Sequence, residues 1–492
     1  MTIETAAPAQ ATFDSLDPRT GEVVGTHPVH PATDVDAAVA RAADTAQWWA
    51  DLGFDGRRSV LVEWRRALVR RLDDLARTVA DETGKPFDDA RLELVLTVDH
   101  LDWAAKNAAR VLDTRKVPSG LLMANQAATL RYAPVGVVGV IGPWNYPVFT
   151  PMGSIAYALA AGNAVVFKPS ELTPGVGVAL ADSLAEIVAG RPLLQVVTGF
   201  GETGAALCRA PGIGKIAFTG STATGKRVMA ACAERLTPVL IECGGKDALI
   251  VDSDADLAAA ADAAVWGGMS NAGQTCIGVE RVYVHQDVAE PFIAAVTAKA
   301  KALRVGTEFG PMTMPSQTEV VRGHVEDALA RGGRAVVGGA DSADTAFVEP
   351  VVIVDVPEDS TAVTEETFGP LLVVNRVPDV DEAVRRANDS AYGLGATVFS
   401  AARGEEIAAR LRCGMVSVNS VIAFAGIPAL PFGGVGDSGF GRIHGDDGLR
   451  EFTRPQAVAR QRFALPIAVT SFRRTAAGMR ALVGVVRVLR GR

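Results

Sequence analysis

The N-terminal part of the chain alternates apolar and polar positions with the period of an α-helix. From residue 34 to about residue 109, apolar side chains recur every three or four positions, with arginine and aspartate on the opposite face. The sequence Thr-Gly-Lys-Pro at 83–86 predicts a break between two of these helices. Residues 1–35 predict a loose lead-in with short extended pieces.

After residue 130 the pattern changes to short, continuous apolar runs separated by helical segments. Such runs are typical of the strands of a parallel sheet that helices cover on both faces. The sequence therefore predicts an α/β protein. The runs lie at 135–141, 164–167, 194–197, 216–218 and 239–241 and, in a second series, at 248–250, 280–285, 335–337, 351–355, 371–376, 397–399 and 415–418.

Polar or glycine-rich turns follow the strands of the first series. Ligands of parallel α/β sheets bind beyond the carboxyl ends of the strands. The turns at Asn145, Lys168, Gly199, Gly220 and Glu242 all fall at such ends. The sequence therefore predicts a ligand site along this edge of the first sheet.

Cys276 is the candidate nucleophile. It ends the run Gly-Gly-Met-Ser-Asn-Ala-Gly-Gln-Thr-Cys at 267–276, whose small residues let a ligand approach the backbone closely. A buried, inert thiol is the alternative, because cysteine is often a small core residue. Glu242 and Asn145 supply a carboxylate and an amide donor, each in its own glycine-rich turn. Together the three suggest covalent chemistry on a carbonyl group.

Two glycine-rich turns are candidates for binding a dinucleotide. Residues 199–204 match GxGxxG between a strand and a helix, but the acid expected about 20 residues further on is missing. Residues 220–226 nearly form a P-loop but continue with Arg227 in place of the magnesium ligand, which argues against ATP chemistry. Free backbone N–H groups at this helix start would still suit a dinucleotide phosphate.

Lys168 and Glu171 follow the strand at 164–167. Lys168 could hold ribose hydroxyls, and Glu171 could accept a hydrogen bond from a ribose 2′-OH while repelling a 2′-phosphate. Two surface charges on a loop are the alternative. The first interpretation favours NAD⁺ over NADP⁺ as the cofactor.

Composition and charge limit the other function classes. The chain has 492 residues, which is enough for two or three domains, and a net charge of −8, which gives no reason to expect nucleic acid. The residues up to Thr12 lack the features of a secretory signal, and no apolar run is long enough to span a membrane. We therefore expect a protein of the cytoplasm. The five scattered cysteines suggest neither a disulfide framework nor a metal site: Cys208, Cys232, Cys243, Cys276 and Cys413.

The tail from Leu465 to Arg492 has a different composition, with six arginines and no acidic residue. Its apolar side chains fall on one face of a helix, and a basic amphipathic helix can lie on an anionic membrane. Peripheral contact with the inner face of the membrane is one interpretation. A solvated terminal helix or a subunit contact is the other. The apolar face comprises Met479, Leu482, Val483, Val486 and Leu489.

Six motifs, in order along the chain, resemble those of the aldehyde dehydrogenase superfamily. The resemblance runs from about Asp17 to about Phe452, and the C-terminal tail lies outside it. One departure is Cys243, where the family usually has leucine. The motifs are Pro-Trp-Asn145-Tyr-Pro, Lys168-Pro-Ser-Glu171, Phe218-Thr-Gly-Ser-Thr-Ala-Thr-Gly225, Glu242-Cys-Gly-Gly-Lys246, Gly273-Gln-Thr-Cys276 and Glu365-Glu-Thr-Phe-Gly-Pro370.

The resemblance implies a Rossmann-like cofactor domain, an α/β catalytic domain and a small β element through which such proteins form homodimers or homotetramers. A basic amphipathic tail follows them. The implied boundaries are 1–115 with 134–243 for the NAD-binding domain, 244–453 for the catalytic domain and 116–133 with 454–466 for the oligomerisation element; the tail, outside the resemblance, is 467–492.

The resemblance also implies roles for individual residues. Cys276 would be the nucleophile, Glu242 the general base, and Asn145 with the Cys276 N–H the oxyanion hole. The implied reaction is NAD-dependent oxidation of a small aldehyde to its acid through a thiohemiacetal and a thioester, with no metal. The implied cofactor contacts are Trp144, Lys168, Glu171, Gly201, Gly220, Ser221, Glu366 and Phe368.

Three alternatives stay open at this point. A coenzyme-A-acylating enzyme would release the thioester to a thiol, although Glu242 favours hydrolysis. A non-catalytic binding protein of this fold would not need Cys276, Glu242 and Asn145 together. A succinate-semialdehyde-type enzyme would need a cationic group at the pocket mouth, and the sequence does not place Arg281 there.

Overall fold

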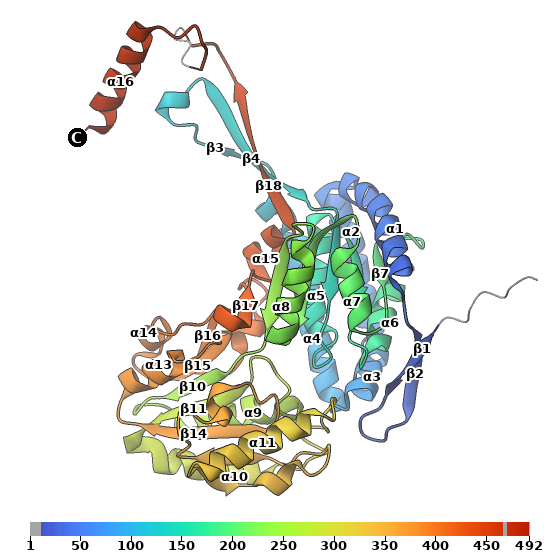
Figure 1. Cartoon of the computed structure of the whole chain (residues 1–492), viewed down its shortest axis with the longest axis vertical. Helices are drawn as coiled ribbons and strands as arrows, with labels where there is room; N and C mark the ends of the chain where they lie inside the picture. The colour runs from blue at the N-terminus through green and yellow to red at the C-terminus, as the bar shows by residue number, and fades with distance from the viewer. Residues whose placement is uncertain (1–10, 466–469, 492) are drawn as a thin grey trace, which may run out of the picture. The chain divides into compact units, whose positions relative to one another are not determined.

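The computed structural model describes residues 11–465 and 470–491 (Figure 1). Contacts divide the chain into two units, one of Met1–Val111 with Pro134–Thr453 and one of Leu112–Ala133 with Arg454–Arg492. Parts of three predicted segments lie outside the described residues: 1–10 of the cofactor domain, 466 of the oligomerisation element, and 467–469 with 492 of the tail.

The first unit begins with a two-stranded antiparallel sheet and four helices. Gly84 adopts a left-handed conformation at the end of the third helix, which confirms the predicted break. The predicted helical region from residue 34 is confirmed as well. The elements are β1 (Thr12–Leu16), β2 (Val23–Pro28), α1 (Ala32–Asp51), α2 (Gly53–Arg70), α3 (Leu72–Thr83) and α4 (Phe87–Leu112).

A six-stranded sheet follows, in the order β17-β9-β8-β5-β6-β7. All neighbouring strands are parallel except β17, which runs antiparallel to β9. The strands are β5 (Val137–Ile141), β6 (Ala164–Lys168), β7 (Leu194–Val196), β8 (Ile213–Gly220), β9 (Val239–Cys243) and β17 (Gly439–Phe440), and the connecting helices are α5 (Phe149–Ala161), α6 (Pro174–Ala185), α7 (Gly201–Arg209) and α8 (Thr222–Ala233).

A seven-stranded sheet forms the rest of this unit, in the order β12-β13-β14-β11-β10-β15-β16, with only β12 antiparallel to its neighbour. Its strands are β10 (Asp247–Val251), β11 (Val279–His285), β12 (Arg334–Val337), β13 (Val351–Val354), β14 (Leu371–Val377), β15 (Gly395–Phe399) and β16 (Met415–Val418). Its helices are α9 (Leu257–Met269), α10 (Ala289–Ala302), α11 (Gln317–Ala330), α12 (Thr361–Thr364), α13 (Val380–Asn388), α14 (Gly404–Ala408) and α15 (Gly445–Glu451).

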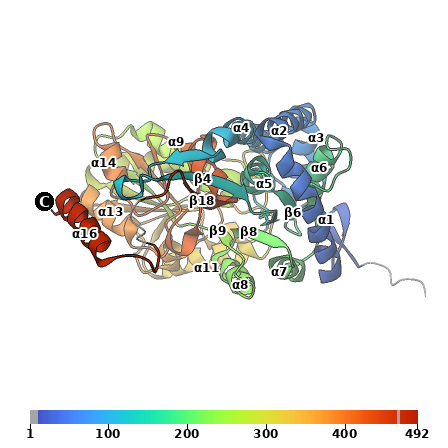
Figure 2. The same cartoon turned by 90° about the horizontal axis from the view of Figure 1, so that it is seen from above.

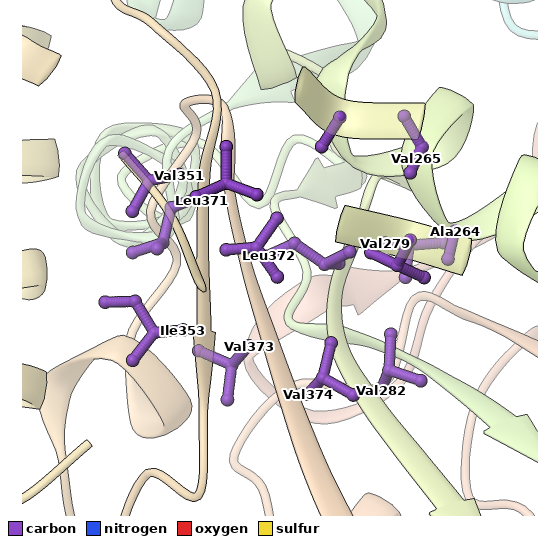
Figure 3. Packing of buried hydrophobic residues seen from close by; sticks show 14 of the residues in the cluster. Ala264, Val265, Val279, Val282, Val351, Ile353, Leu371, Leu372, Val373 and Val374 are labelled. Atoms are coloured by element: carbon purple, nitrogen blue, oxygen red, sulfur yellow. The ribbon is translucent and has the colours of Figure 1, made fainter. Parts of the chain in front are cut away.

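Alternate side chains of the central strand β10 pack into different cores. Leu249 and Val251 join the cluster that α9, α10 and α11 complete, part of which Figure 3 shows. Ala248 and Ile250 join the cluster formed with α13 and α14. Because successive side chains of a strand point to opposite faces, helices cover both faces of this sheet, as the continuous apolar runs predicted.

The connection between the two sheets positions the site. Residues 244–246 alone join β9 to β10, so the carboxyl end of β9 lies next to the amino end of β10. The turns that contain Asn145 and Gly220 follow strands of the first sheet at that edge, whereas Cys276 and Glu366 precede β11 and β14 of the second. Residues of both sheets therefore meet between these two edges.

The second unit contains a three-stranded sheet in the order β18-β4-β3 and the C-terminal helix (Figure 2). Asn125 accepts a hydrogen bond from the Arg462 backbone N–H at 2.8 Å. No residue of the C-terminal helix is buried, and no helix within the described ranges is long and apolar enough to cross a membrane. The elements are β3 (Arg115–Val117), β4 (Gln126–Pro134), β18 (Thr453–Gln461) and α16 (Ala476–Arg490).

The predicted domain boundaries stay a prediction, and one strand pairing crosses them. β17 lies within the range predicted for the catalytic domain, but it pairs with β9 of the predicted cofactor domain. Gly439 is opposite Glu242 in this pairing. The C-terminal part of the chain therefore packs against the strand that carries the candidate base.

Candidate active site

A tight turn after α9 presents Cys276. Asn271 and Ala272 adopt left-handed conformations with φ of 51° and 55°, and Gly273 continues with φ of 70°. A Cβ on Gly273 would lie 2.2 Å from the carbonyl carbon of Gly369. Only glycine therefore fits this turn. The turn leaves the Cys276 thiol half-buried, in contrast to the buried Cys243.

Cys276 lines two cavities. The first, here called the apolar cavity, also has Leu92, Leu96, Phe149, Trp266, Ile422 and Phe432 in its wall. The second, here called the strand-end cavity, lies at the carboxyl ends of β5, β8 and β9. Its wall contains Trp144, Gly220, Ser221, Gln317, Glu366 and Phe368.

Five of the eight predicted cofactor residues thus line the strand-end cavity, and three do not. Lys168 and Glu171 lie beyond its wall, at the end of β6, where the Lys168 Nζ is 3.2 Å from the Glu171 Oε2. Gly201 begins α7, after the edge strand β7. β6 lies next to β5 in the sheet, and β7 lies next to β6. An extended ligand that leaves the cavity along this edge would therefore pass Lys168 and Glu171 first and Gly201 next.

The Asn145 side chain is buried beside the Cys276 loop. Its Nδ2 donates a hydrogen bond to the Gln274 carbonyl at 2.9 Å. A primary amide has two N–H donors, so one remains for a ligand. The Asn145 carbonyl accepts hydrogen bonds from Lys85 Nζ at 2.8 Å and from Asn271 Nδ2 at 3.1 Å. The backbone of Asn145 is therefore held from two directions.

Lys85 and Glu93 form a buried ion pair beside the Asn145 turn, and no sequence pattern indicated it. Lys85 Nζ is 2.7 Å from Glu93 Oε2, and the two side chains are 1% and 0% exposed. Glu93 Oε1 accepts the backbone N–H groups of Val148 and Phe149 at 2.8 and 3.0 Å. The pair thereby ties the break after α3 to the first turn of α5.

Glu242 is buried at the end of β9, and its carboxylate lines neither cavity. Its Oε1 has no hydrogen-bond partner among the described residues. Burial raises the pKa of Glu242 well above its usual value, against the opposing charge of Arg442. The carboxylate faces Gly433, where a Cβ would lie 2.6 Å from Oε1, so this position requires glycine.

The thiol of Cys276 is held in its neutral form. Burial raises its pKa first, and the negative charges of Glu242 and Glu366 raise it further. A thiolate is the reactive form, so the thiol must release its proton to solvent when the nucleophile forms. The raised pKa of Glu242 makes it a stronger general base, one that can take a proton from water.

Glu366 reaches back across the strand-end cavity to the β9–β10 connection. Its Oε1 accepts the Gly245 backbone N–H at 3.1 Å, and burial raises the pKa of Glu366 to about 8. A Cβ on Gly244 would lie 1.9 Å from Glu366 Oε1. Gly244 therefore makes room for this carboxyl group.

A second buried ion pair, Lys246 with Glu280, holds the turn that contains Glu366. Glu280 accepts the backbone N–H groups of Thr367 and Phe368 at 2.8 and 3.0 Å. Lys246 Nζ also donates to Thr367 Oγ1 at 3.0 Å. This pair joins two of the sequence motifs, although the sequence assigned neither residue a role.

The strand-end cavity fits one end of a dinucleotide. The Ser221 hydroxyl accepts the Thr224 backbone N–H and caps α8, whose start leaves further N–H groups for a phosphate. Phe368 has a φ of 50° and packs edge-on against Trp144, with ring centroids 5.5 Å apart. Strain of this kind is common where a ligand is clamped. The cavity then leads directly to Cys276.

Comparisons with known proteins show what the whole chain is similar to. The sequence profile described as the aldehyde dehydrogenase family matches residues 5–458. A Mycobacterium ulcerans protein, provisionally named succinate-semialdehyde dehydrogenase [NADP(+)] 2, is 39% identical over 90% of this chain and 87% of its own length. The 4,4′-diapolycopene aldehyde oxidase of a Methylomonas species is 38% identical over 98% of this chain and 92% of its own.

Solved structures give the same result. The NAD-dependent aldehyde dehydrogenase of Sinorhizobium meliloti superimposes with a TM-score of 0.89 and 32% identity, over 94% of each chain. The α/β fold with its parallel sheets is therefore that of these enzymes. With a matching profile over most of its length, this chain belongs to the aldehyde dehydrogenase family.

Proposed function

We propose that this enzyme oxidises an aldehyde to its carboxylic acid with Cys276 as the nucleophile. The observation that carries the proposal is that Cys276 lines both cavities, so that an aldehyde in the apolar cavity meets a dinucleotide in the strand-end cavity at its sulfur. Geometry of this kind holds two reactants in contact and supplies much of the rate acceleration.

The chain's own residues carry the proton and charge transfers. Cys276 releases its proton to solvent water and its thiolate adds to the carbonyl carbon, and the second N–H of the Asn145 amide stabilises the alkoxide together with the Cys276 backbone N–H. The chemistry that NAD(P)⁺ supplies when bound is acceptance of a hydride from the adduct carbon, which leaves a thioester on Cys276. Glu242 then activates water for hydrolysis, which requires its carboxylate to turn from Gly433 towards the thioester.

NADH formation at 340 nm across a panel of aldehydes tests the proposal. Turnover should be lost in Cys276→Ala, whereas Glu242→Gln should give a single burst without a steady state, because hydrolysis is blocked after the thioester forms. Turnover by the native chain only with added coenzyme A would show an acylating enzyme instead. Bound cofactor without turnover under either condition would indicate a non-catalytic protein.

The preferred cofactor in this proposal is NAD⁺. Its support is Glu171, whose carboxylate lies at the end of β6 and is 41% exposed, beside Lys168. A ribose 2′-OH can donate a hydrogen bond to this carboxylate, whereas a 2′-phosphate is repelled by its negative charge. The name of the Mycobacterium ulcerans relative, which specifies NADP⁺, points the other way. Equal or better kcat/KM with NADP⁺ would refute the preference. Glu171→Gln should reduce the difference in kcat/KM between NAD⁺ and NADP⁺.

The names of the relatives leave the aldehyde open. One names succinate semialdehyde and the other names 4,4′-diapolycopene aldehyde, at nearly equal identity to this chain. We keep succinate semialdehyde as the alternative substrate. Its four-carbon chain ends in a carboxylate, so the charges in the apolar cavity distinguish the two cases.

The second unit carries the proposed assembly into a homodimer or homotetramer. Eight of the nine residues of β18, all after Thr453, are exposed in the single chain. An exposed strand with unpaired backbone groups favours pairing with a second copy. Light scattering after size exclusion measures the state directly, and a monomer at micromolar concentration would contradict the proposal.

The helix α16 supports peripheral contact with the inner face of a cytoplasmic membrane. No residue of α16 is buried, and its exposed apolar residues include Met479, Val483 and Leu489. The arginines of the tail complement anionic lipid, although the whole chain is negatively charged. In liposome flotation with anionic vesicles, the full chain should float and a chain ending at Leu465 should not. Both remaining in solution would exclude the contact.

A further inference from the structure

We propose that the substrate is an uncharged aldehyde with an apolar chain, and that Asp89 is the residue that excludes anionic aldehydes. The proposal rests on the proposed function and deepens it by naming the substrate class. It follows from the wall of the apolar cavity and from the charges that this wall does and does not offer.

Most of the surface that the apolar cavity exposes to a ligand is hydrophobic. The space measures about 790 Å³ including its open mouth. Leu92 of α4 and Trp266 of α9 both line it, although they lie far apart in the sequence, and each residue remains 47% exposed. Exposed large apolar side chains at the entrance of a cavity mark a surface that an apolar ligand covers. Each methylene group buried there should raise kcat/KM about fourfold.

The cation in the wall is already neutralised. Lys85 donates to Glu93 and to the Asn145 carbonyl, and its Nζ lies 4.2 Å from the centre of the Tyr146 ring. Its side chain is 1% exposed. Lys85 therefore has no free donor directed towards a substrate carboxylate.

Asp89 adds a negative charge to the same wall. It lies on α4 one turn before Glu93 and is half-buried, and no hydrogen bond or close ion pair is found for its side chain in the described part of the chain. Together Lys85, Asp89 and Glu93 give a net charge of 1 − 2 = −1. Burial raises the pKa of Asp89, as expected for a carboxylate without a full partner.

Arg281 does not change this balance. Its guanidinium donates to the Lys246 carbonyl at 2.9 and 2.6 Å and does not line the apolar cavity. A substrate carboxylate would therefore lose its hydration without gaining a charged partner, and it would meet the charge of Asp89. An alkyl or aryl chain has no charge to desolvate, and Asp89 does not repel it.

Steady-state kcat/KM values for propanal, hexanal, decanal, succinate semialdehyde and 4-aminobutanal test the proposal on the full chain. The kcat/KM for hexanal should exceed that for succinate semialdehyde about a hundredfold, because the carboxylate would lose its hydration without a charged partner and would be repelled by Asp89. Asp89→Asn should raise kcat/KM for succinate semialdehyde about tenfold more than for hexanal. Asp88→Asn is the matched control, because the Asp88 side chain is 86% exposed and paired with Arg91. It should leave the ratio unchanged.

A preference of the native chain for succinate semialdehyde or 4-aminobutanal would overturn the proposal, as would an Asp89→Asn variant with an unchanged ratio. Binding of the same aldehydes to Cys276→Ala, measured by isothermal titration, ranks them without turnover. Tighter binding of decanal there supports the proposal even if the native chain fails to oxidise any aldehyde, a result that would contradict the proposed function instead. Tighter binding of succinate semialdehyde would overturn the proposal directly.

Discussion

Two buried lysine–glutamate pairs hold the two sides of Cys276, and they do so in different ways. Lys85 and Glu93 fix the turn of Asn145 on the side of the apolar cavity. Lys246 and Glu280 fix the Glu366–Phe368 turn on the side of the strand-end cavity. In both pairs the glutamate accepts two backbone N–H groups of a loop that lies far away in the sequence.

The pairs differ in where their residues originate. Glu93 comes from α4, outside both large sheets, and accepts N–H groups at the start of α5, where the helix dipole favours a negative charge. Glu280 comes from β11, the direct neighbour of β14, and the turn that donates these N–H groups to Glu280 immediately precedes β14. The substrate side therefore depends on the N-terminal helices, whereas the cofactor side is held within the second sheet.

Glu93→Gln should have the largest effect on this arrangement. The amide oxygen can still accept the Val148 and Phe149 N–H groups, but Lys85 loses its counter-charge in a buried position. Breaking a buried pair in this way costs about 3–5 kcal/mol of unfolding free energy. We also expect kcat to fall roughly a hundredfold, because the Asn145 donor shifts. Urea unfolding and steady-state kinetics measure the two effects.

The exposed pair of Glu63 with Arg66 supplies the matched control. The Glu63 side chain is 45% exposed, so Glu63→Gln should change stability by less than about 0.5 kcal/mol and leave kcat as it is. If Glu93→Gln were as mild as this control, the ion pair would have no part in positioning Asn145.

Glu280→Gln should have a smaller effect, confined to the cofactor side. Burial lowers the pKa of Lys246, so this lysine can lose its proton once its partner is neutral, and it keeps the Thr367 hydroxyl. We expect the dissociation constant of NAD(P)⁺ to rise about tenfold, or ~1.4 kcal/mol, as the Phe368 turn loosens. Fluorescence titration with the cofactor checks this. An equal loss of aldehyde binding to Cys276→Ala/Glu280→Gln would show that the two sides are not independent.

The sequence patterns picked out residues that line the two cavities better than residues that hold the surrounding turns in place. Cys276, Glu366 and Phe368 stood in recognisable motifs, and the structure brings them to the cavity walls. Lys85 stood in a predicted helix break, and Glu93 stood on a helix as one charge among many. Their pairing depends on how α4 packs against α5, which no local pattern encodes.

The helical spacing of three tryptophans indicated core positions rather than a stacking surface, and this prediction is confirmed for two of them. The stripe of Trp48, Trp49 and Trp64 has helical spacing, and Trp49 and Trp64 are fully buried. Trp48 is only half-buried, and Arg191 lies over its ring at 4.5 Å. The helix α11 was not predicted, since its buried apolar positions, Val321, Val325 and Ala328, are few and lie among charged residues.

The pH dependence of stability should give the smallest effect, and Glu366 on the cofactor side should contribute to it. Burial raises the pKa of Glu366 to about 8 and that of Asp247 to about 7, whereas unfolded carboxyl groups titrate near pH 4. Between these values the folded chain binds more protons than the unfolded chain, so its stability falls as pH rises. The stability that these groups contribute is complete below about pH 4 and is lost by about pH 8.

Thermal unfolding of the cofactor-free enzyme between pH 5.5 and pH 8.5 measures this slope. Because Glu366 is not fully shielded from water, we expect its part of the fall to be only about 1–2 kcal/mol. Glu366→Gln should flatten the slope by that amount, since a neutral amide does not titrate. Asp89→Asn, on the substrate side, should flatten it less, because Asp89 is more open to solvent. A larger change from Asp89→Asn would mean that buried carboxylates destabilise the substrate side more than the cofactor side.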